Sequence, residues 1–163
     1  MKILAFSGPS NSGKTTLIVK VSNILQDRGF KVGIIKHDPK DKARFDVDGK
    51  DSFKFTQTGA DVAVVSSTRT TIFKQHSSEL DELIDNFKNN DYLLVEGLKT
   101  LELPRISIFR NRLDESYFNC SDAIASDESI NNDEIPNTLD KLDLNNPDEI
   151  INWIDNNSKT INA

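Results

Sequence analysis

The residues best suited to chemistry lie near the N-terminus, where Gly8 to Thr15 read Gly-Pro-Ser-Asn-Ser-Gly-Lys-Thr. Glycines let such a loop turn tightly, and successive N–H groups, including those of Asn11 and Ser12, then point inward as a nest for anions. The spacing assigns Lys14 to the β- and γ-phosphates of a nucleoside triphosphate and the Thr15 hydroxyl to magnesium. A helix that begins at the loop adds its partial positive charge. The motif therefore predicts a phosphate-binding loop, or P-loop.

Two acidic residues are further candidates. Glu96 ends the apolar run Tyr-Leu-Leu-Val-Glu, and a carboxylate beside the first strand can orient magnesium or a water bound to it. Asp127 follows the apolar segment 123–125, and α/β nucleotide-binding proteins often bind the base at the carboxyl end of a strand. A carboxylate can accept hydrogen bonds from guanine N1 and N2, a donor pair that adenine lacks. The Asn-Lys-x-Asp signature of many guanine-specific proteins is absent, so a turn or helix cap remains the alternative role for Asp127. For Glu96 the alternative is a solvated strand end.

The segments around the loop predict how these residues are positioned. Residues 2–6 read as a buried strand, and residues 31–36 read as a second one. Between them a helix follows the loop and ends near Gly29, with one apolar face formed by Leu17, Val21, Ile24 and Leu25. A strand–helix–strand unit favours a parallel sheet with a right-handed crossover. The sequence predicts a three-layer α/β fold with a mainly parallel sheet flanked by helices.

The rest of the chain supplies further elements, and we expect one domain over residues 1–163. A β-hairpin is predicted from the strands 61–65 and 69–74, with Ser-Ser-Thr in the turn. Other strands are expected at 91–96, 105–109 and 123–125, and helices at 49–58, after Ser78, and from Asn146-Pro147 onward. Segment 38–48 reads as a mobile loop, and the Asn/Asp-rich segment 130–145 reads as irregular.

Composition and charge exclude several classes of function. The 163-residue chain has a net charge of −6, which argues against nucleic acid as the main partner, because such binding depends on Lys and Arg. No apolar run approaches the ~20 residues that cross a bilayer, so no membrane partner is expected. The single cysteine, Cys120, allows no internal disulfide, and we expect a cytoplasmic protein. His37 and His76 are isolated and form no cluster with transition-metal spacing. The basic residues between 36 and 54 form either an anion-binding rim or, slightly favoured by composition, an ordinary charged loop.

Several short motifs together resemble one family, the molybdopterin-guanine dinucleotide biosynthesis protein B (MobB) family. The resemblance covers nearly the whole chain and rests on the order and spacing of the motifs rather than on the phosphate loop alone. They are Phe-Ser-Gly-Pro-Ser-Asn-Ser-Gly-Lys-Thr-Thr-Leu at 6–17, Gly-Ile-Ile-Lys-His at 33–37, Phe-Asp-Val-Asp-Gly-Lys-Asp-Ser at 45–52, Thr-Gly-Ala at 58–60, Leu-Val-Glu-Gly-Leu-Lys at 94–99, Pro-Arg-Ile at 104–106 and Ile-Ala-Ser-Asp at 124–127. One departure is Asp-Pro-Lys-Asp-Lys at 38–42, where many members carry extra histidines.

This resemblance implies a GTP-binding homodimer with weak Mg²⁺-dependent GTPase activity. The family assists a MobA-type nucleotidyltransferase that joins a guanosine nucleotide to molybdopterin. The implied catalytic residues are Lys14 and Glu96, with Thr15 and Glu96 at the magnesium. Segments 46–52 and 96–99 would frame the γ-phosphate. The residues implied to bind phosphates are Gly8, Gly13, Lys14, Thr15 and Thr16.

A P-loop small-molecule kinase is the main alternative reading. Such enzymes usually bring several arginines over the transferring phosphate, and the six arginines of this chain form no clear lid-like cluster. A nucleotide-dependent metal-insertion protein would carry a His/Cys cluster, which the sequence lacks. A non-catalytic nucleotide-bound adaptor would differ from a weak GTPase only in rate.

Overall fold

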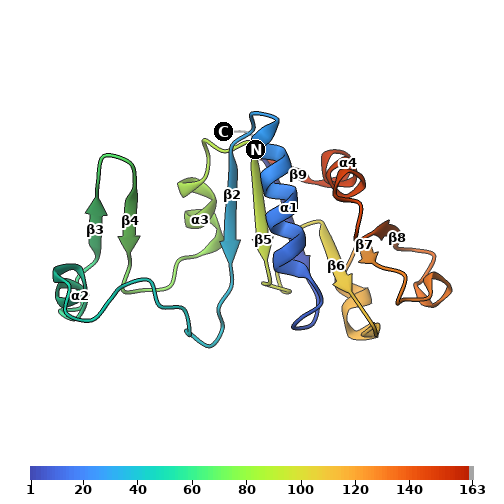
Figure 1. Cartoon of the computed structure of the whole chain (residues 1–163), viewed down its shortest axis with the longest axis horizontal. Helices are drawn as coiled ribbons and strands as arrows, with labels where there is room; N and C mark the ends of the chain where they lie inside the picture. Colours follow the sequence, from blue (N-terminus) through green and yellow to red (C-terminus); the bar gives the residue numbers. More distant parts are fainter. Residues whose placement is uncertain (162–163) are drawn as a thin grey trace. The chain divides into compact units, whose positions relative to one another are not determined.

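A computed structural model of the chain describes residues 1–161, which form two compact units. One unit contains residues 1–37 and the chain from residue 84 onward, and the other contains residues 38–83. The first unit is built on a seven-stranded sheet (Figure 1). Six parallel strands lie in the order β2 (Val32–Lys36), β5 (Tyr92–Glu96), β1 (Lys2–Ser7), β6 (Arg105–Phe109), β7 (Ala123–Ser126) and β8 (Asp140–Asp143), and β9 (Lys159–Thr160) pairs antiparallel with β1.

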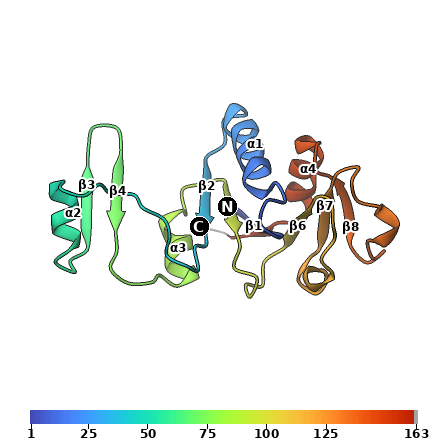
Figure 2. The same ribbon diagram turned by 60° about the horizontal axis from the view of Figure 1, so that its bottom comes forward.

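Two helices cover one face of this sheet, as Figure 2 shows: α1 (Lys14–Asp27) and α4 (Pro147–Asn157). Their apolar sides share one core with alternate residues of the strands, such as Leu4, Phe6 and Ile108. Side chains of the opposite face, including Phe109, pack with the 3₁₀-helix η1 (Glu115–Cys120). The alternation follows from the two-residue period of a strand. The mainly parallel sheet flanked by helices confirms the expected fold class.

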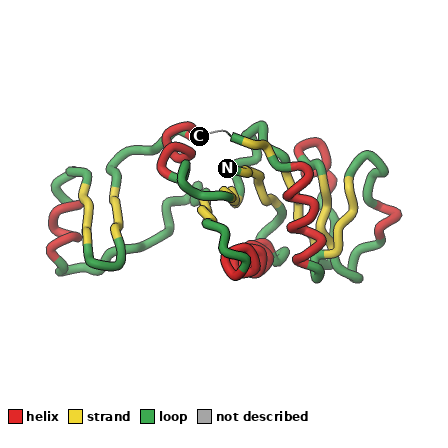
Figure 3. The backbone as a smooth tube through the Cα atoms, turned by 90° about the horizontal axis from the view of Figure 1, so that it is seen from above, coloured by secondary structure: helices red, strands yellow, loops and turns green. Residues whose placement is uncertain are grey.

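The second unit contains the predicted hairpin, with β3 (Val62–Val65) antiparallel to β4 (Thr70–Phe73). The short helix α2 (Asp51–Thr56) lies beside β3 (Figure 3). The helix α3 (Leu80–Asn86) begins in this unit and continues past its boundary at Leu83. None of the residues in α2, β3 or β4 is buried.

The expectation that segment 130–145 is irregular is wrong in part. The 3₁₀-helix η2 (Asn132–Glu134) and the edge strand β8 lie within it, and Leu142 is the one buried residue of β8. Its sequence, Asp-Lys-Leu-Asp, carries a single apolar residue and therefore no periodicity that could indicate a strand. The sequence reading also missed η1 and β9, which are short.

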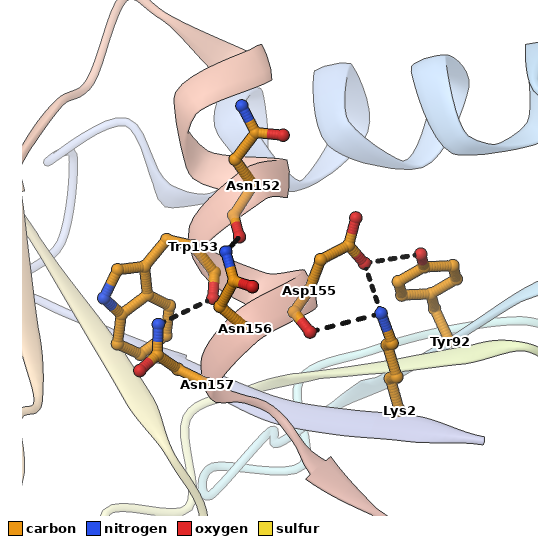
Figure 4. Close-up of polar contacts among 7 residues, drawn as sticks. All are labelled: Lys2, Tyr92, Asn152, Trp153, Asp155, Asn156 and Asn157. Carbon is orange, nitrogen blue, oxygen red and sulfur yellow. Dashed lines mark hydrogen bonds and ion pairs between the residues drawn. The ribbon is translucent and has the colours of Figure 1, made fainter.

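Polar contacts fix α4 to the middle of the sheet (Figure 4). Asp155 Oδ1 accepts hydrogen bonds from Lys2 Nζ and Tyr92 Oη, each at 2.7 Å. Burial and the Asp155 carboxylate raise the pKa of Tyr92 to about 12. On the other side of the helix, Trp153 Nε1 donates to Asp140 Oδ2 at 2.7 Å. Within residues 1–161, no helix combines the length and apolar character that a membrane span requires.

Candidate nucleotide-binding site

The phosphate loop connects β1 to α1 and contains a run of left-handed backbone conformations. The φ angles are +135° at Gly8, +64° at Asn11 and +99° at Gly13. A Cβ atom on Gly8 would lie 2.4 Å from the carbonyl oxygen of Ile108, so the loop approaches β6 too closely for any side chain at this position. The same conformations suit an anion nest in front of a helix N-terminus. Inside the loop, the buried Ser12 hydroxyl has no hydrogen-bond partner among the described residues.

Lys14 lies over the loop that precedes it. Its Nζ atom donates to the carbonyl oxygens of Gly8 at 3.0 Å and Pro9 at 2.7 Å. Burial lowers the pKa of Lys14, an effect that nearby Glu96 opposes and Lys36 reinforces. Because both hydrogen-bond partners are neutral carbonyls, the positive charge is available to a phosphate group.

Sheet pairing places Glu96 at the end of β5, beside the end of β1. Glu96 pairs in register with Phe6 of β1 and Lys36 of β2. Its side chain is 12% exposed, and its Oε2 atom lies 3.1 Å from Lys36 Nζ. The pairing with Phe6 places the Glu96 carboxylate at the end of β1, where the phosphate loop begins, and Glu96 opposes the lowering of the Lys14 pKa by burial.

Thr15 and Glu96 supply the oxygen donors that magnesium prefers. No group of three or more His, Cys, Asp or Glu side chains in residues 1–161 is arranged to hold a metal ion. Magnesium commonly takes only one or two protein ligands and completes its shell with substrate phosphates and water, so a hydroxyl and a carboxylate beside a phosphate loop fit this ion. A magnesium ion held there would supply positive charge against the phosphate groups of a bound nucleotide.

Arg105 is a buried cation that the sequence marked only as part of a motif. Its side chain, 1% exposed, makes four hydrogen bonds to neutral groups. Nη1 donates to Ser7 Oγ at 2.8 Å and the Gly97 carbonyl at 3.1 Å, and Nη2 donates to the carbonyls of Leu98 and Leu101, each at 3.0 Å. Burial lowers its pKa. Arg105 therefore ties the loop that follows Glu96 to the end of β1. In the sequence, the only indication of this role was that a charged residue, Arg105, begins an otherwise largely apolar strand.

Asp127 lies directly after β7 and is held by two residues that the sequence did not single out. Its Oδ2 atom is 3.2 Å from Arg110 Nε. Its Oδ1 atom accepts from the backbone N–H of Ser129 at 3.1 Å and from the Ser129 hydroxyl. The Ser129 hydroxyl lowers the pKa of Asp127, burial opposes this, and Arg110 adds to the lowering. Asp127 therefore caps a local turn and also presents an ionised carboxylate, so the two readings of this residue are compatible.

A cavity of about 420 Å³ opens at the carboxyl ends of β7 and β8. Asp127 and Asn145 line it from the two neighbouring strand ends. Arg110 contacts Asp127 at this cavity and also lies next to the phosphate loop. A Cβ atom on Gly13 would lie 3.4 Å from Arg110 Nε. The described fold thus brings the loop residues, Glu96 and Asp127 to the same edge of the sheet.

The segment 46–52, expected near the γ-phosphate, belongs to the second unit. There the Ser52 hydroxyl donates to Asp46 Oδ1 at 3.1 Å. Among the basic residues between 36 and 54, Lys36 pairs with Glu96 of the neighbouring strand, whereas Lys54 pairs locally with Asp51 at 3.1 Å. Nucleotide binding by these segments stays a prediction.

Comparisons with known proteins agree with the fold. The family model of MobB, molybdopterin guanine dinucleotide synthesis protein B, matches residues 3–127. The chain is 36% identical over 118 residues to the molybdopterin-guanine dinucleotide biosynthesis adapter protein of Escherichia coli, covering 67% of this chain and 66%, just under two thirds, of that protein. The adapter protein of Haemophilus influenzae is 29% identical over 162 residues, covering 94% of this chain and 88% of that protein. The crystal structure of Bacillus subtilis MobB aligns with a TM-score of 0.78 at 22% identity, covering 99% of this chain and 100% of that chain, and shows the shared fold.

Proposed function

Because the chain belongs to the MobB family of molybdopterin guanine dinucleotide synthesis proteins, we propose that it binds GTP with magnesium and assists molybdenum cofactor maturation. Its partner would be a MobA-type nucleotidyltransferase that attaches GMP to molybdopterin. The phosphate loop supports this proposal most directly. Left-handed residues, a helix N-terminus and the Lys14 ammonium meet there beside Glu96.

The preference for guanine rests on Asp127. An aspartate is ionised at neutral pH and the Ser129 hydroxyl lowers the pKa of Asp127 further, so its carboxylate can only accept hydrogen bonds. Guanine offers donors at N1 and N2, whereas adenine has an acceptor at N1. The cavity next to Asp127 supports the placement of the base there.

Hydrolysis by the protein alone should be slow. An arginine that reaches the transferring phosphate is worth ~10³–10⁵ in rate. Two arginines near the site already have other partners. The guanidinium group of Arg105 donates hydrogen bonds to four neutral acceptors, and that of Arg110 contacts Asp127 and Asn145. The proposed function is therefore assistance with slow GTP turnover, which fits better than the alternative of a small-molecule kinase.

The proposed homodimer finds support in the second unit. Its exposed apolar residues include Phe45, Val47, Phe55, Val65 and Ile72. Two strands with no buried residue form a hairpin that is marginally stable at best in water, so a covering surface would stabilise it. A second copy of this chain supplies such a surface in the proposed assembly.

The test combines binding with reconstitution. Lys14→Ala should remove most affinity for Mg·GTP without unfolding the protein, because Lys14 contributes charge to the loop rather than packing. Lys20→Ala, on the exposed side of α1, is the matched control and should bind like the wild type. With a MobA-type enzyme and molybdopterin present, the wild type should raise the yield of guanine dinucleotide cofactor and the Lys14 variant should not. Equal GTP affinity in both variants would refute nucleotide binding at this loop, and equal cofactor yield would refute the assisting role.

A further inference from the structure

The base cavity has a second polar wall, formed by Asn145. Residues Ser126 of β7 and Asp143 of β8 pair in register, so Asp127 and Asn145 follow the ends of neighbouring parallel strands. Both line the cavity of about 420 Å³. The backbone N–H of Asn145 donates to Asp143 Oδ1 at 2.8 Å, which fixes the chain where it leaves β8.

Arg110 contacts both residues. Its Nε atom lies 3.2 Å from Asp127 Oδ2, and its Nη2 atom donates to Asn145 Oδ1 at 3.4 Å. A guanidinium group has donors and no acceptor. It therefore selects the orientation in which the amide oxygen of Asn145 faces Arg110, and the amide NH₂ group is left for a ligand.

We propose that Asn145 is a specificity residue that donates a hydrogen bond from its NH₂ group to O6 of guanine, with Arg110 positioning Asn145 and Asp127 together. This inference rests on the proposed binding of guanine at Asp127. The guanine edge presents donors at N1 and N2 next to an acceptor at O6. An ionised carboxylate beside an amide NH₂ group complements that sequence of donors and acceptors.

Asp127 can adopt this role with one local change. A carboxylate has about four acceptor positions. Ser129 occupies two of them through its N–H and hydroxyl groups, and Arg110 occupies a third. Contacts to both N1 and N2 therefore require the Ser129 hydroxyl to rotate away from Oδ1, while the N–H bond and the Arg110 contact remain.

The experiment compares GTP with 6-thio-GTP, which keeps N1–H and the 2-amino group but replaces O6 by a sulfur that accepts hydrogen bonds weakly. The wild type should bind GTP about 3- to 10-fold more tightly, the range expected for one net hydrogen bond. Asn145→Leu should lower GTP affinity by the same factor and leave 6-thio-GTP affinity nearly unchanged. Asn152→Leu makes the same substitution on the exposed side of α4 and should preserve the wild-type ratio.

Further ligands and variants separate the two proposals. ITP lacks the 2-amino group and therefore reports on the contact to Asp127, whereas 6-thio-GTP reports on the contact to Asn145. Because Arg110 positions both residues, Arg110→Met should reduce both the GTP/ITP and the GTP/6-thio-GTP affinity ratios. Asn145→Leu should reduce only the second ratio. Asn145→Asp keeps the size of the side chain and removes its donor, and it should reproduce the loss if the leucine variant does not fold. A GTP/6-thio-GTP ratio near one in the wild type, or an unchanged ratio in either Asn145 variant, would overturn the role of Asn145. A wild type that binds ATP as well as GTP would instead overturn the guanine proposal itself.

Discussion

Replacing Arg105 by methionine should destabilise the protein and loosen the loop that follows Glu96. Methionine keeps most of the side-chain length but removes the guanidinium group and its four hydrogen bonds. Three acceptors are carbonyls of Gly97, Leu98 and Leu101, and the fourth is the buried hydroxyl oxygen of Ser7. A net contribution of about 1 kcal/mol for each bond gives about 4 kcal/mol.

Two effects reduce this figure. Exposed residues such as Thr100 let the loop relax toward water, which can satisfy its carbonyls. The desolvation penalty of a buried charge also disappears with the guanidinium group. We therefore expect Arg105→Met to lower the free energy of unfolding by about 2–4 kcal/mol.

Urea denaturation followed by Trp153 fluorescence measures the global effect, and amide hydrogen exchange over residues 97–103 measures the local one. Ser7→Ala removes one of the four bonds and should cost about 0.5–1.5 kcal/mol. Arg28→Met removes an exposed ion pair with Asp148 and should change stability by about 0–1 kcal/mol. The reasoning about Arg105 is wrong if Arg105→Met lowers the free energy of unfolding no more than this surface control and the loop amides exchange as in the wild type.

Three further predictions concern the base, the sheet and the hairpin. Asp127→Asn should lose GTP affinity and gain affinity for xanthosine triphosphate (XTP), because an amide can donate a hydrogen bond where a carboxylate only accepts. An unchanged GTP/XTP affinity ratio in titration calorimetry would mean that other residues recognise the base. Since the pKa of Tyr92 is raised from 10.0 to about 12, its neutral form stabilises the fold below pH 10, and this stability is lost as the pH rises toward 12. Tyr92→Phe should flatten that decline in chemical denaturation, and an equally steep decline would exclude Tyr92 as its source. Val65→Asp or Ile72→Asp should shift the proposed dimer to monomer in analytical ultracentrifugation, and an unchanged mass would locate the interface outside the hairpin.

The phosphate loop and the central strands were predictable because their signals are local. The spacing of Gly8, Gly13 and Lys14 encodes one backbone conformation, and apolar runs mark β1 and β5. The hairpin was also predictable from two β-branched runs around Ser-Ser-Thr. Each of these features depends on residues that are neighbours in the sequence.

Contacts between separate elements explain what the sequence reading missed. Arg105, Arg110 and Asn145 gain their roles from partners on other strands and loops, and an isolated charged or amide residue does not reveal such a partner. The edge strand β8 has one buried side chain, so its pattern resembles a polar loop. Asn145 was missed together with β8, because its place beside Asp127 depends on that pairing.

The central position of β1 also has a consequence for synthesis on the ribosome. The phosphate motif is translated well before β5 and β6, yet β1 lies between these two strands in the sheet. Gly8 packs against Ile108, so the support for the loop emerges roughly 100 residues after the loop itself, about 5–20 s later at typical elongation rates. The nascent chain therefore carries a complete nucleotide motif that has no rigid frame until β6 is available. A nucleotide would then bind only after β6 has emerged, and its binding would stabilise the newly closed sheet by mass action.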